Sequence, residues 1–191
     1  MAATRAQSAS TPRAAPLTDA ITMLTADHAE VRQLFDRFDE LCSMHADADS
    51  RQSLIENLCA VLTAHTMIEE ELFYPAARQA IAEARLLDHA TEDHARAKEL
   101  IAQLVDASAS DALFNTRVHL LREAIERHVA QEEAELFPQV RKTALDLQAM
   151  VPRMAARKEE STSPSRPSTK YSFGIPIRSP RRSSDFINAS E

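Results

Sequence analysis

Four stretches of the chain repeat large apolar residues at three- and four-residue steps, and each stretch has a histidine near its middle. This spacing places side chains on one face of an α-helix, so each stretch predicts an amphipathic helix with a histidine on its buried face. The expected helices span about residues 18–43, 51–78, 83–105 and 111–141. Glycine occurs only at Gly174, and no apolar run has a two-residue period, so strands and hairpins lack their usual signals.

Short connections separate these four helices, near residues 45–50, 79–82 and 106–110. Short connections favour antiparallel neighbours, so the sequence predicts an all-α, up-down-up-down antiparallel four-helix bundle. A further amphipathic stretch, residues 144–160, predicts a short extra C-terminal helix across one end of the bundle. Pro152 must begin or bend that helix, because proline lacks the backbone N–H that a helix interior uses.

Composition divides the chain into three parts. Residues 1–17 have few large apolar side chains, so we expect a disordered arm. Residues 18–160 contain the helical pattern and form the folded bundle. Residues 161–191 are rich in Ser, Pro and Arg and are expected to be a second disordered segment, unrelated to the chemistry of the bundle.

Charge and hydropathy narrow the classes of partner. The net charge is −7, and because residues 1–18 carry +2 and residues 161–191 carry +3, the segment between them carries −12. Because this central segment is strongly acidic, it repels phosphate backbones. We therefore expect no nucleic-acid partner. No stretch approaches the roughly 20 apolar residues of a membrane helix, and no secretory signal is evident, so a soluble cytoplasmic protein is expected. An acid-free N-terminus is also typical of an organelle transit peptide, which stays the alternative.

One motif occurs twice, on the second and the fourth expected helix. His65 is followed four residues later by Glu69 and ten residues later by a proline, and His128 is followed in the same way by Glu132. Residues i and i+4 lie one helical turn apart on the same face, so each helix offers a nitrogen and a carboxylate to one inward site.

The histidines of the four helices lie at similar depths, so they can converge on one layer of the bundle together with the two glutamates. An uncompensated buried carboxylate costs several kcal/mol or more, and a pair of cations removes that cost. Imidazole and carboxylate donors suit iron, manganese or zinc. Cys42 and Cys59 lie on or beside apolar helical faces as small hydrophobes, so a closed thiolate zinc site is not expected.

This arrangement of a lone His, a doubled His-x-x-x-Glu and a Glu- or Asp-preceded His resembles the hemerythrin family, the HHE cation-binding domains, over about residues 18–160. The resemblance implies a non-haem di-iron centre with two iron ions, in preference to manganese or zinc. Carried over residue by residue, it implies four histidine ligands and two bridging glutamates. The implied metal ligands are His28, His65, Glu69, His94, His128 and Glu132.

Departures from the oxygen-carrying hemerythrins bear on function. Those proteins have a fifth histidine four residues before the position of His94, where this chain has Ala90. His89 could replace it only if the helix were overwound or bulged. The carriers also place an aspartate where this chain has Glu133, so Glu133 is the alternative ligand to Glu132. The chain therefore resembles the branch with four histidines and two glutamates, and reversible oxygen transport is not expected.

Residues beside the doubled motif have structural interpretations. Phe73, Tyr74 and Phe137 are expected in the core or as an apolar lid over an open coordination position. Pro75 and Pro138 are expected to kink or end their helices.

The remaining acidic residues of these segments are expected outside the ligand set. Glu70, Glu71 and Glu133 are interpreted as solvated or outer groups. Glu135 lies seven residues after His128, back on the inner face, where it would line an access channel.

We therefore expect a metal-centred function in which oxygen, peroxide or nitric oxide meets the iron, for sensing, scavenging or iron handling. No protein partner is indicated, and no protein nucleophile or acid–base set identifies an enzyme. The alternatives are a peroxide-decomposing di-iron enzyme and a helical interaction module with a structural metal. A ferritin-like oxidase fits less well, because that class uses Glu-x-x-His, the opposite order.

Overall fold

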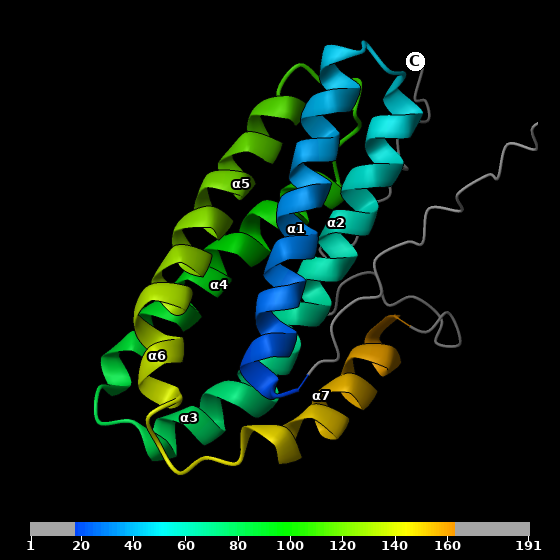
Figure 1. The fold of residues 1–191 in the computed structure, drawn as a ribbon. Coiled ribbons are helices and arrows are strands. Elements are labelled where there is room, and N and C mark those ends of the chain that lie inside the picture. The colour runs from blue at the N-terminus through cyan, green and yellow to red at the C-terminus, as the bar shows by residue number, and fades with distance from the viewer. Residues whose placement is uncertain (1–17, 163–191) are drawn as a thin grey trace, which may run out of the picture.

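A computed structural model describes residues 18–162, and every regular element in that range is helical. Figure 1 shows long helices that run in alternating directions, followed by a separate helix at the end of the described chain. The elements are α1 (Ala20–Ser43), α2 (Ala48–Ile68), η1 (Glu69–Phe73), α3 (Tyr74–Ala80), α4 (Ala84–Val105), α5 (Phe114–Gln131), η2 (Glu132–Leu136), α6 (Phe137–Val140) and α7 (Leu147–Thr162). The predicted disordered segments, residues 1–17 and all but the first two residues of 161–191, lie outside the described range.

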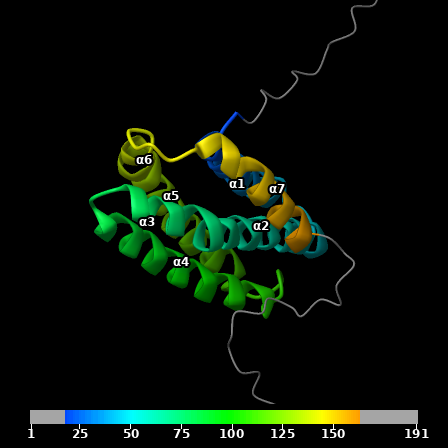
Figure 2. The ribbon, with the colours of Figure 1, turned by 90° about the horizontal axis from the view of Figure 1, so that it is seen from below.

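The four long helices form the expected antiparallel bundle. The second consists of α2, η1 and α3, and the fourth of α5, η2 and α6; α1 packs against α2, and α4 packs against α5. The extra C-terminal helix is also present: α7 lies outside the bundle against α1 and α2, as the view from below in Figure 2 shows. Pro152 lies inside α7 and not at its start. The prediction of an all-α four-helix bundle with one additional helix is confirmed.

Two aspartates set where the first two helices begin. Asp19 accepts a hydrogen bond from the backbone N–H of Thr22 at 2.9 Å, and Asp47 accepts one from that of Ser50 at 2.7 Å. Such bonds satisfy N–H groups that the first helical turn leaves without a partner. The first helix therefore begins at Ala20, two residues after the predicted start, and the second helix begins at Ala48 and not near residue 51.

Both His-x-x-x-Glu segments continue into a π-helical turn. In η1 the N–H of Tyr74 donates to the carbonyl of Glu69, and in η2 the N–H of Phe137 donates to that of Glu132, so each bond spans five residues. Pro75 and Pro138 follow in the first turn of the next α-helical piece, where a missing N–H costs little. The prolines therefore do not end these helices. The wider turn before each proline accommodates the backbone hydrogen bond that proline cannot donate.

The π-turns also change which residues face inward. A wider turn adds one residue, which corresponds to about 100° of rotation in an α-helix. Phe73 and Leu136, eight residues after the motif histidines, are fully buried. Leu72 is only half-buried, and Glu135 is exposed. Glu135 therefore does not line an inner channel, and the α-helical periodicity that placed it there fails at the π-turn.

Apolar side chains form two cores separated along the bundle axis. The upper core lies toward the α1–α2 loop and includes Val31, Phe35 and Leu62, whereas the lower core lies toward α7 and includes Leu24 and Phe73. Between them, each of the four long helices contributes buried polar residues. Apolar packing on both sides holds this polar layer away from solvent.

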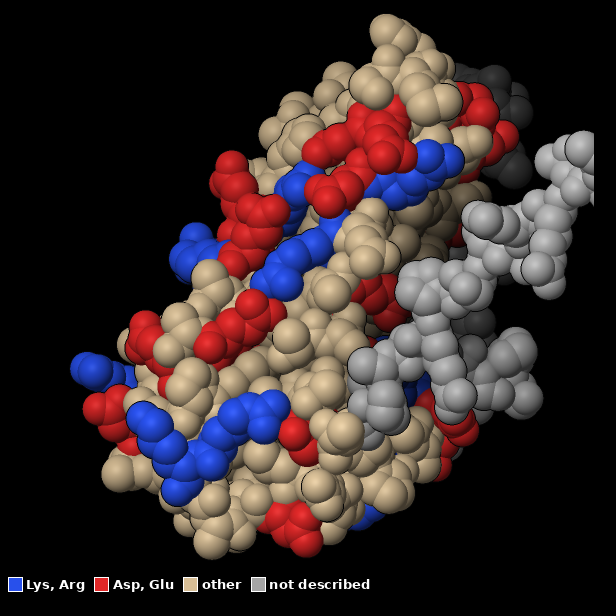
Figure 3. All heavy atoms as spheres, viewed as in Figure 1, with Lys and Arg blue, Asp and Glu red and all other residues tan. Residues whose placement is uncertain are grey.

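The surface carries mixed charge. On the face shown in Figure 3, acidic and basic side chains are interspersed. One ion-pair cluster joins two helices, where Arg122 of α5 pairs with Asp36 and Asp39 of α1. Among the described residues, 18–162, no helix combines the length and hydrophobicity that a membrane span requires.

Candidate metal centre

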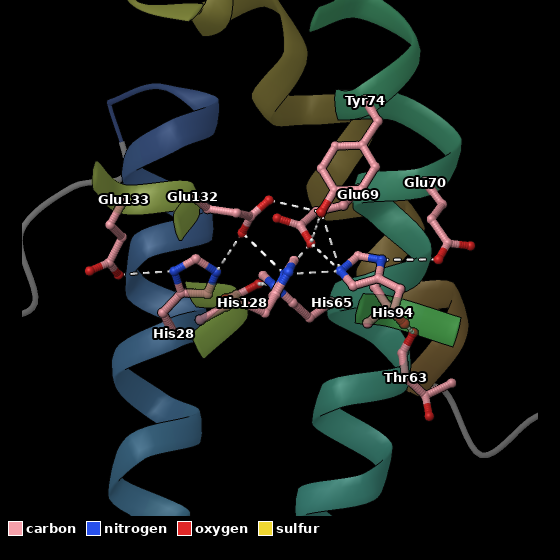
Figure 4. A network of polar contacts seen from close by, with 12 residues as sticks. His28, Thr63, His65, Glu69, Glu70, Tyr74, His94, His128, Glu132 and Glu133 are labelled. Carbon is pink, nitrogen blue, oxygen red and sulfur yellow. Dashed lines mark hydrogen bonds and ion pairs between the residues drawn. The ribbon is translucent and has the colours of Figure 1, made fainter. Parts of the chain in front are cut away.

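The polar layer contains the predicted donors, drawn together in Figure 4. Each is at most 3% exposed. They comprise one histidine from α1, one histidine and one glutamate from α2 and η1, one histidine from α4, and one histidine and one glutamate from α5 and η2. The six are His28, His65, Glu69, His94, His128 and Glu132.

Each glutamate lies between histidines of different helices. Glu69 Oε2 lies 3.1 Å from Nε2 of His65 and 3.2 Å from Nε2 of His94. Glu132 Oε2 lies 3.3 Å from Nε2 of both His28 and His128. The carboxylates therefore connect all four helices through one layer.

The donors form two overlapping groups, each able to hold a cation. One consists of His28, His65, Glu69 and Glu132, and the other of Glu69, His94 and His128. Within each group the donor atoms lie within 4.8 Å of one another. Because Glu69 belongs to both groups and Glu132 also contacts His128, the arrangement suits two cations that share carboxylates.

Tyr74 completes the layer from the start of α3. Its hydroxyl donates to Glu132 Oε1 at 2.8 Å, with Glu69 Oε2 at 3.3 Å and His94 Nε2 at 3.2 Å. Burial, together with the charges of Glu69 and Glu132, raises the pKa of Tyr74 well above its usual value. The hydroxyl therefore keeps its proton, which it donates to Glu132 while lying beside Glu69.

The acid–base states in this layer follow from burial and from the partners. Burial alone would lower the pKa of His65, but the charge of Glu69 and a contact with Asp27 raise it to about 10. Burial opposes the same kind of shift at His94, whose pKa is raised by Glu69 and Glu70. Burial would raise the pKa of Glu69, but His65 and His94 hold it well below its usual value. Without cations, the raised pKa values of His65 and His94 favour protons on these two rings, which offset the charge of the carboxylates.

Three histidines have a second carboxylate at Nδ1, on the side away from the layer. His28 Nδ1 lies 3.0 Å from Glu133 Oε1, and His94 Nδ1 lies 3.0 Å from Glu70 Oε1. His65 Nδ1 lies 3.6 Å from Oδ2 of the buried Asp27. Carboxylates at this position fix ring orientation and leave Nε2 for a metal.

The chemistry of the donor set fits metal ions. Seven buried side-chain nitrogen or oxygen atoms in the described range make no hydrogen bond, and six of them belong to this layer and to Asp27 beside it. Two donors about 2.1 Å from one cation lie roughly 3.0 to 3.4 Å apart for bond angles between octahedral and tetrahedral values. The observed spacings of 3.1 to 3.3 Å fall in that interval.

A small cavity adjoins the layer on the side of the upper core. Its volume is about 10 Å³, and all four histidines line it. The remaining wall is Thr66 and four aliphatic side chains, namely Val31, Leu62, Ile125 and Val129. Space of this size admits about one water-sized molecule.

The two alternative donors, His89 and Glu133, lie outside the shared layer. His89 is exposed on α4, which stays α-helical there, so it does not reach the layer. Glu133 contacts the outer nitrogen of His28 and not the shared layer, so geometry favours Glu132. Cys59 is buried in the upper core, where burial raises the pKa of its thiol to about 12, in keeping with the expected inert role.

The sequence patterns did not identify two residues of the site, Tyr74 and Asp27. Tyr74 was expected only as core or lid, and its proximity to both carboxylates depends on the π-turn that precedes it. Asp27 lies three residues after Leu24 and four before Val31, at the edge of the apolar stripe, so this spacing could have identified it. Its burial depends on α7, which covers that side of α1.

Comparisons with known proteins agree with this geometry. A family model described as the Hemerythrin HHE cation binding domain matches residues 19–140. A protein from Nostoc sp. described as a DNA nickase is 30% identical over 119 residues, which cover 62% of this chain and 32% of that protein. This chain therefore spans about a third of the length of that relative.

A solved structure shares the fold. The crystal structure of a hemerythrin HHE cation binding domain-containing protein from Mycobacterium kansasii aligns with a TM-score of 0.63 and 23% identity. The alignment covers 75% of this chain and 86% of that one.

Proposed function

Because this chain belongs to the hemerythrin family of HHE cation-binding domains, we propose that its buried donor layer holds two iron ions that meet a small oxidising or diatomic ligand. The proposed ligands are the four histidines and the two glutamates of the layer. The single observation that carries the proposal is that all six donors, from four helices, lie in one buried layer with unpartnered atoms facing one another.

The donor types support iron. The layer offers imidazole nitrogens and carboxylate oxygens and no thiolate, a set that suits iron and also accommodates manganese or zinc. Structural zinc sites are usually closed by four ligands, often cysteines. Six protein donors shared by two ions leave coordination positions open, which favours reactivity over a purely structural role.

The surroundings of the layer limit what can reach it. Iron, when bound, supplies ligand binding and one-electron redox chemistry at the open positions. The cavity of about 10 Å³ and its aliphatic wall leave room for about one water-sized molecule, which favours a very small ligand over a larger substrate. Tyr74 holds a proton within reach of both carboxylates, and Phe137 stacks on the ring of His28 at 5.7 Å and keeps water from that side.

We place the function in sensing or scavenging of oxygen, peroxide or nitric oxide, or in iron handling, and not in reversible oxygen transport. Ala90 occupies the position of the fifth histidine of the carriers, and His89 is exposed. The layer therefore has one nitrogen donor fewer than an oxygen carrier uses.

Reconstitution with ferrous iron tests the proposal. The protein, loaded without oxygen, is expected to retain two iron ions per chain and to change its visible absorption when oxygen, hydrogen peroxide or nitric oxide is added. Glu69→Ala removes a carboxylate common to both donor groups and should abolish retention of at least one ion. His89→Ala, which alters an exposed histidine of the same region, is the matched control and should behave as the unaltered protein.

The same experiment separates the two alternatives. Steady oxygen evolution from peroxide that Glu69→Ala abolishes would identify a peroxide-decomposing enzyme. Metal that stabilises the fold but leaves every spectrum unchanged on addition of the three ligands would identify an interaction module with a structural metal.

We do not extend the activity named for the Nostoc protein to this chain. The match covers 32% of that protein, and the acidic segment between residues 19 and 160 disfavours contact with a phosphate backbone. The expected outcome is that supercoiled plasmid stays intact when incubated with the iron-loaded protein in the presence of catalase. Nicking under those conditions would show that this part of the chain carries the activity.

A further inference from the structure

The outer nitrogens of the histidines follow a repeated pattern of histidine, carboxylate and cation. Glu133, which contacts His28 Nδ1, also accepts hydrogen bonds from Arg32 at 3.0 and 2.9 Å. Arg32 lies four residues after His28, one turn along the same helix. The cation therefore holds the carboxylate against the histidine of its own helix.

The second histidine with this pattern is related to the first by the internal repeat of the bundle. Glu70 contacts His94 Nδ1 and accepts hydrogen bonds from Lys98 at 2.7 and 2.6 Å. Lys98 again lies four residues after its histidine. Glu70 directly follows Glu69, as Glu133 follows Glu132 in the other half. Two halves of the bundle thus use the same device.

His65 also has an outer carboxylate that is paired with a cation, but here the cation comes from another helix. Its outer partner is Asp27 Oδ2 at 3.6 Å, and Asp27 Oδ1 accepts a hydrogen bond from Lys158 at 2.6 Å. Lys158 belongs to α7, which lies beyond residues 19–140 that match the family model. Asp27 is 5% exposed, so its charge requires a close cation.

The other half of the bundle has no equivalent of this α7 cation among the described residues. Asp93 precedes His94 as Asp27 precedes His28, but it pairs with Arg127 of α5, at 3.9 Å. The contribution of α7 is therefore one-sided, and it falls on the group made of His28, His65, Glu69 and Glu132.

Contacts independent of Asp27 dock α7 against the bundle. Met154 is fully buried in the lower core. Arg157 makes two hydrogen bonds to Glu71 of η1, at 2.7 and 2.9 Å. Lys158 also approaches the exposed Glu30 at 3.9 Å. Docking of α7 therefore does not depend on Lys158 alone. Mutation can separate the docking of α7 from the contact between Lys158 and Asp27.

We propose that Lys158 is a positioning residue for the metal: through Asp27 it fixes the ring of His65, so that α7 controls how firmly one of the two ions is held. The inference rests on the proposed function, since it needs His65 to bind a metal. A carboxylate on the outer nitrogen sets the orientation of a histidine ligand, and loss of such a partner typically weakens metal binding about 10- to 100-fold. Without Lys158, Asp27 would lose its cation and its fixed position.

The test uses the full chain loaded with two ferrous ions without oxygen, followed by excess ferrozine, whose absorbance reports released iron. Lys158→Met keeps the aliphatic stem and removes the charge. It is expected to speed release of one of the two ions about 10- to 100-fold and to leave the other within about threefold. Lys158→Arg should restore slow release.

Arg157→Met is the matched control, because it removes the neighbouring ion pair of α7 without touching Asp27. It should leave both release rates within about threefold of the unaltered protein. If Arg157→Met and Lys158→Met speed release equally, or if Lys158→Met changes neither ion, Lys158 only docks α7 and the proposal is overturned. If circular dichroism shows Lys158→Met unfolded, Asp27→Asn is used in its place, with the same expected rates and the same refuting result.

Failure of the proposed function has a different signature. In that case the unaltered protein does not retain two ferrous ions, and the proposal about Lys158 falls with it. Retention of two ions by the unaltered protein with no effect of Lys158→Met overturns the positioning role alone.

Discussion

The substitution Tyr74→Phe removes one oxygen from the donor layer and leaves the ring in place. Tyr74 is 4% exposed, and its hydroxyl donates at 2.8 Å to Glu132 while lying near Glu69. A hydrogen bond to a charged group contributes about 1.5 to 3 kcal/mol. We therefore expect the metal-free protein to lose about 2 kcal/mol of unfolding free energy, or about 4 to 8 °C in Tm for a chain of this size.

The loss should be smaller when metal is bound. Cations on the same carboxylates neutralise the charge that the hydroxyl serves, so the contribution falls toward that of a neutral hydrogen bond, about 1 kcal/mol. By thermodynamic linkage, Tyr74→Phe should then bind metal about fivefold more tightly, which corresponds to about 1 kcal/mol. The hydroxyl thus competes with the cations for the carboxylates.

Thermal unfolding of both proteins, with chelator and with saturating ferrous iron, measures the two losses. Thr66→Val is the control, because Thr66 is buried beside the same layer but donates to the backbone carbonyl of Thr63 at 3.2 Å. Its loss should be equal with and without metal. Equal losses for Tyr74→Phe in both states, or weaker metal binding, would refute the competition between hydroxyl and cation.

Three further predictions concern protons and individual donors. Metal binding at pH 7.5 should release about one proton per chain, because the pKa of His65 is raised to about 10 and its proton must leave when a cation binds. This release should decline as the pH rises past 10. A titration in weakly buffered indicator dye that shows no proton release at pH 7.5 would contradict the prediction. Glu132→Ala should lose at least one ion per chain, whereas Glu133→Ala should keep two ions with affinity reduced about 10- to 100-fold. Metal analysis and chelator competition measure both effects. Loss of an ion from Glu133→Ala, with two ions kept by Glu132→Ala, would make Glu133 the ligand. His89→Ala should change neither metal content nor Tm by a measurable amount, and loss of an ion would show that α4 rearranges on metal binding.

Much of the fold follows from local patterns in the sequence. Apolar steps of three and four residues predicted the four long helices, and short connections predicted their antiparallel order, because both depend on neighbours along the chain. Helix starts were less accurate: the first helix begins at Ala20, after the cap Asp19, and not near residue 18, and the second helix begins three residues before Arg51. Several polar residues near each start can serve as a cap, and only the backbone conformation selects one.

The convergence of the donors was also predictable, because an i, i+4 pair lies on one face whatever the tertiary structure. The orientation of the residues after each motif glutamate could not be predicted. The π-turns rotate the following segment, so Glu135 is exposed and Tyr74 reaches the carboxylates. A π-turn depends on tertiary packing around it and has no α-helical period by which the sequence could reveal it.

Outer partners of the histidines were predictable only in part. Glu70 and Glu133 directly follow the motif glutamates, and their interpretation as outer groups agrees with the contacts observed. Asp27 and Lys158 are 131 residues apart in the chain, and their contact depends on how α7 docks. Periodicity within one helix carries no information about such a contact.

Anomalous X-ray diffraction at the iron absorption edge, on crystals of the protein loaded with ferrous iron, tests the central claim most directly. The account predicts two anomalous peaks per chain, roughly 3.5 to 4 Å apart, inside the layer between the two apolar cores. One peak should lie among His28, His65 and the two glutamates, and the other among His94, His128 and the same carboxylates. Absence of iron from this layer, or iron bound only at surface carboxylates, would contradict it.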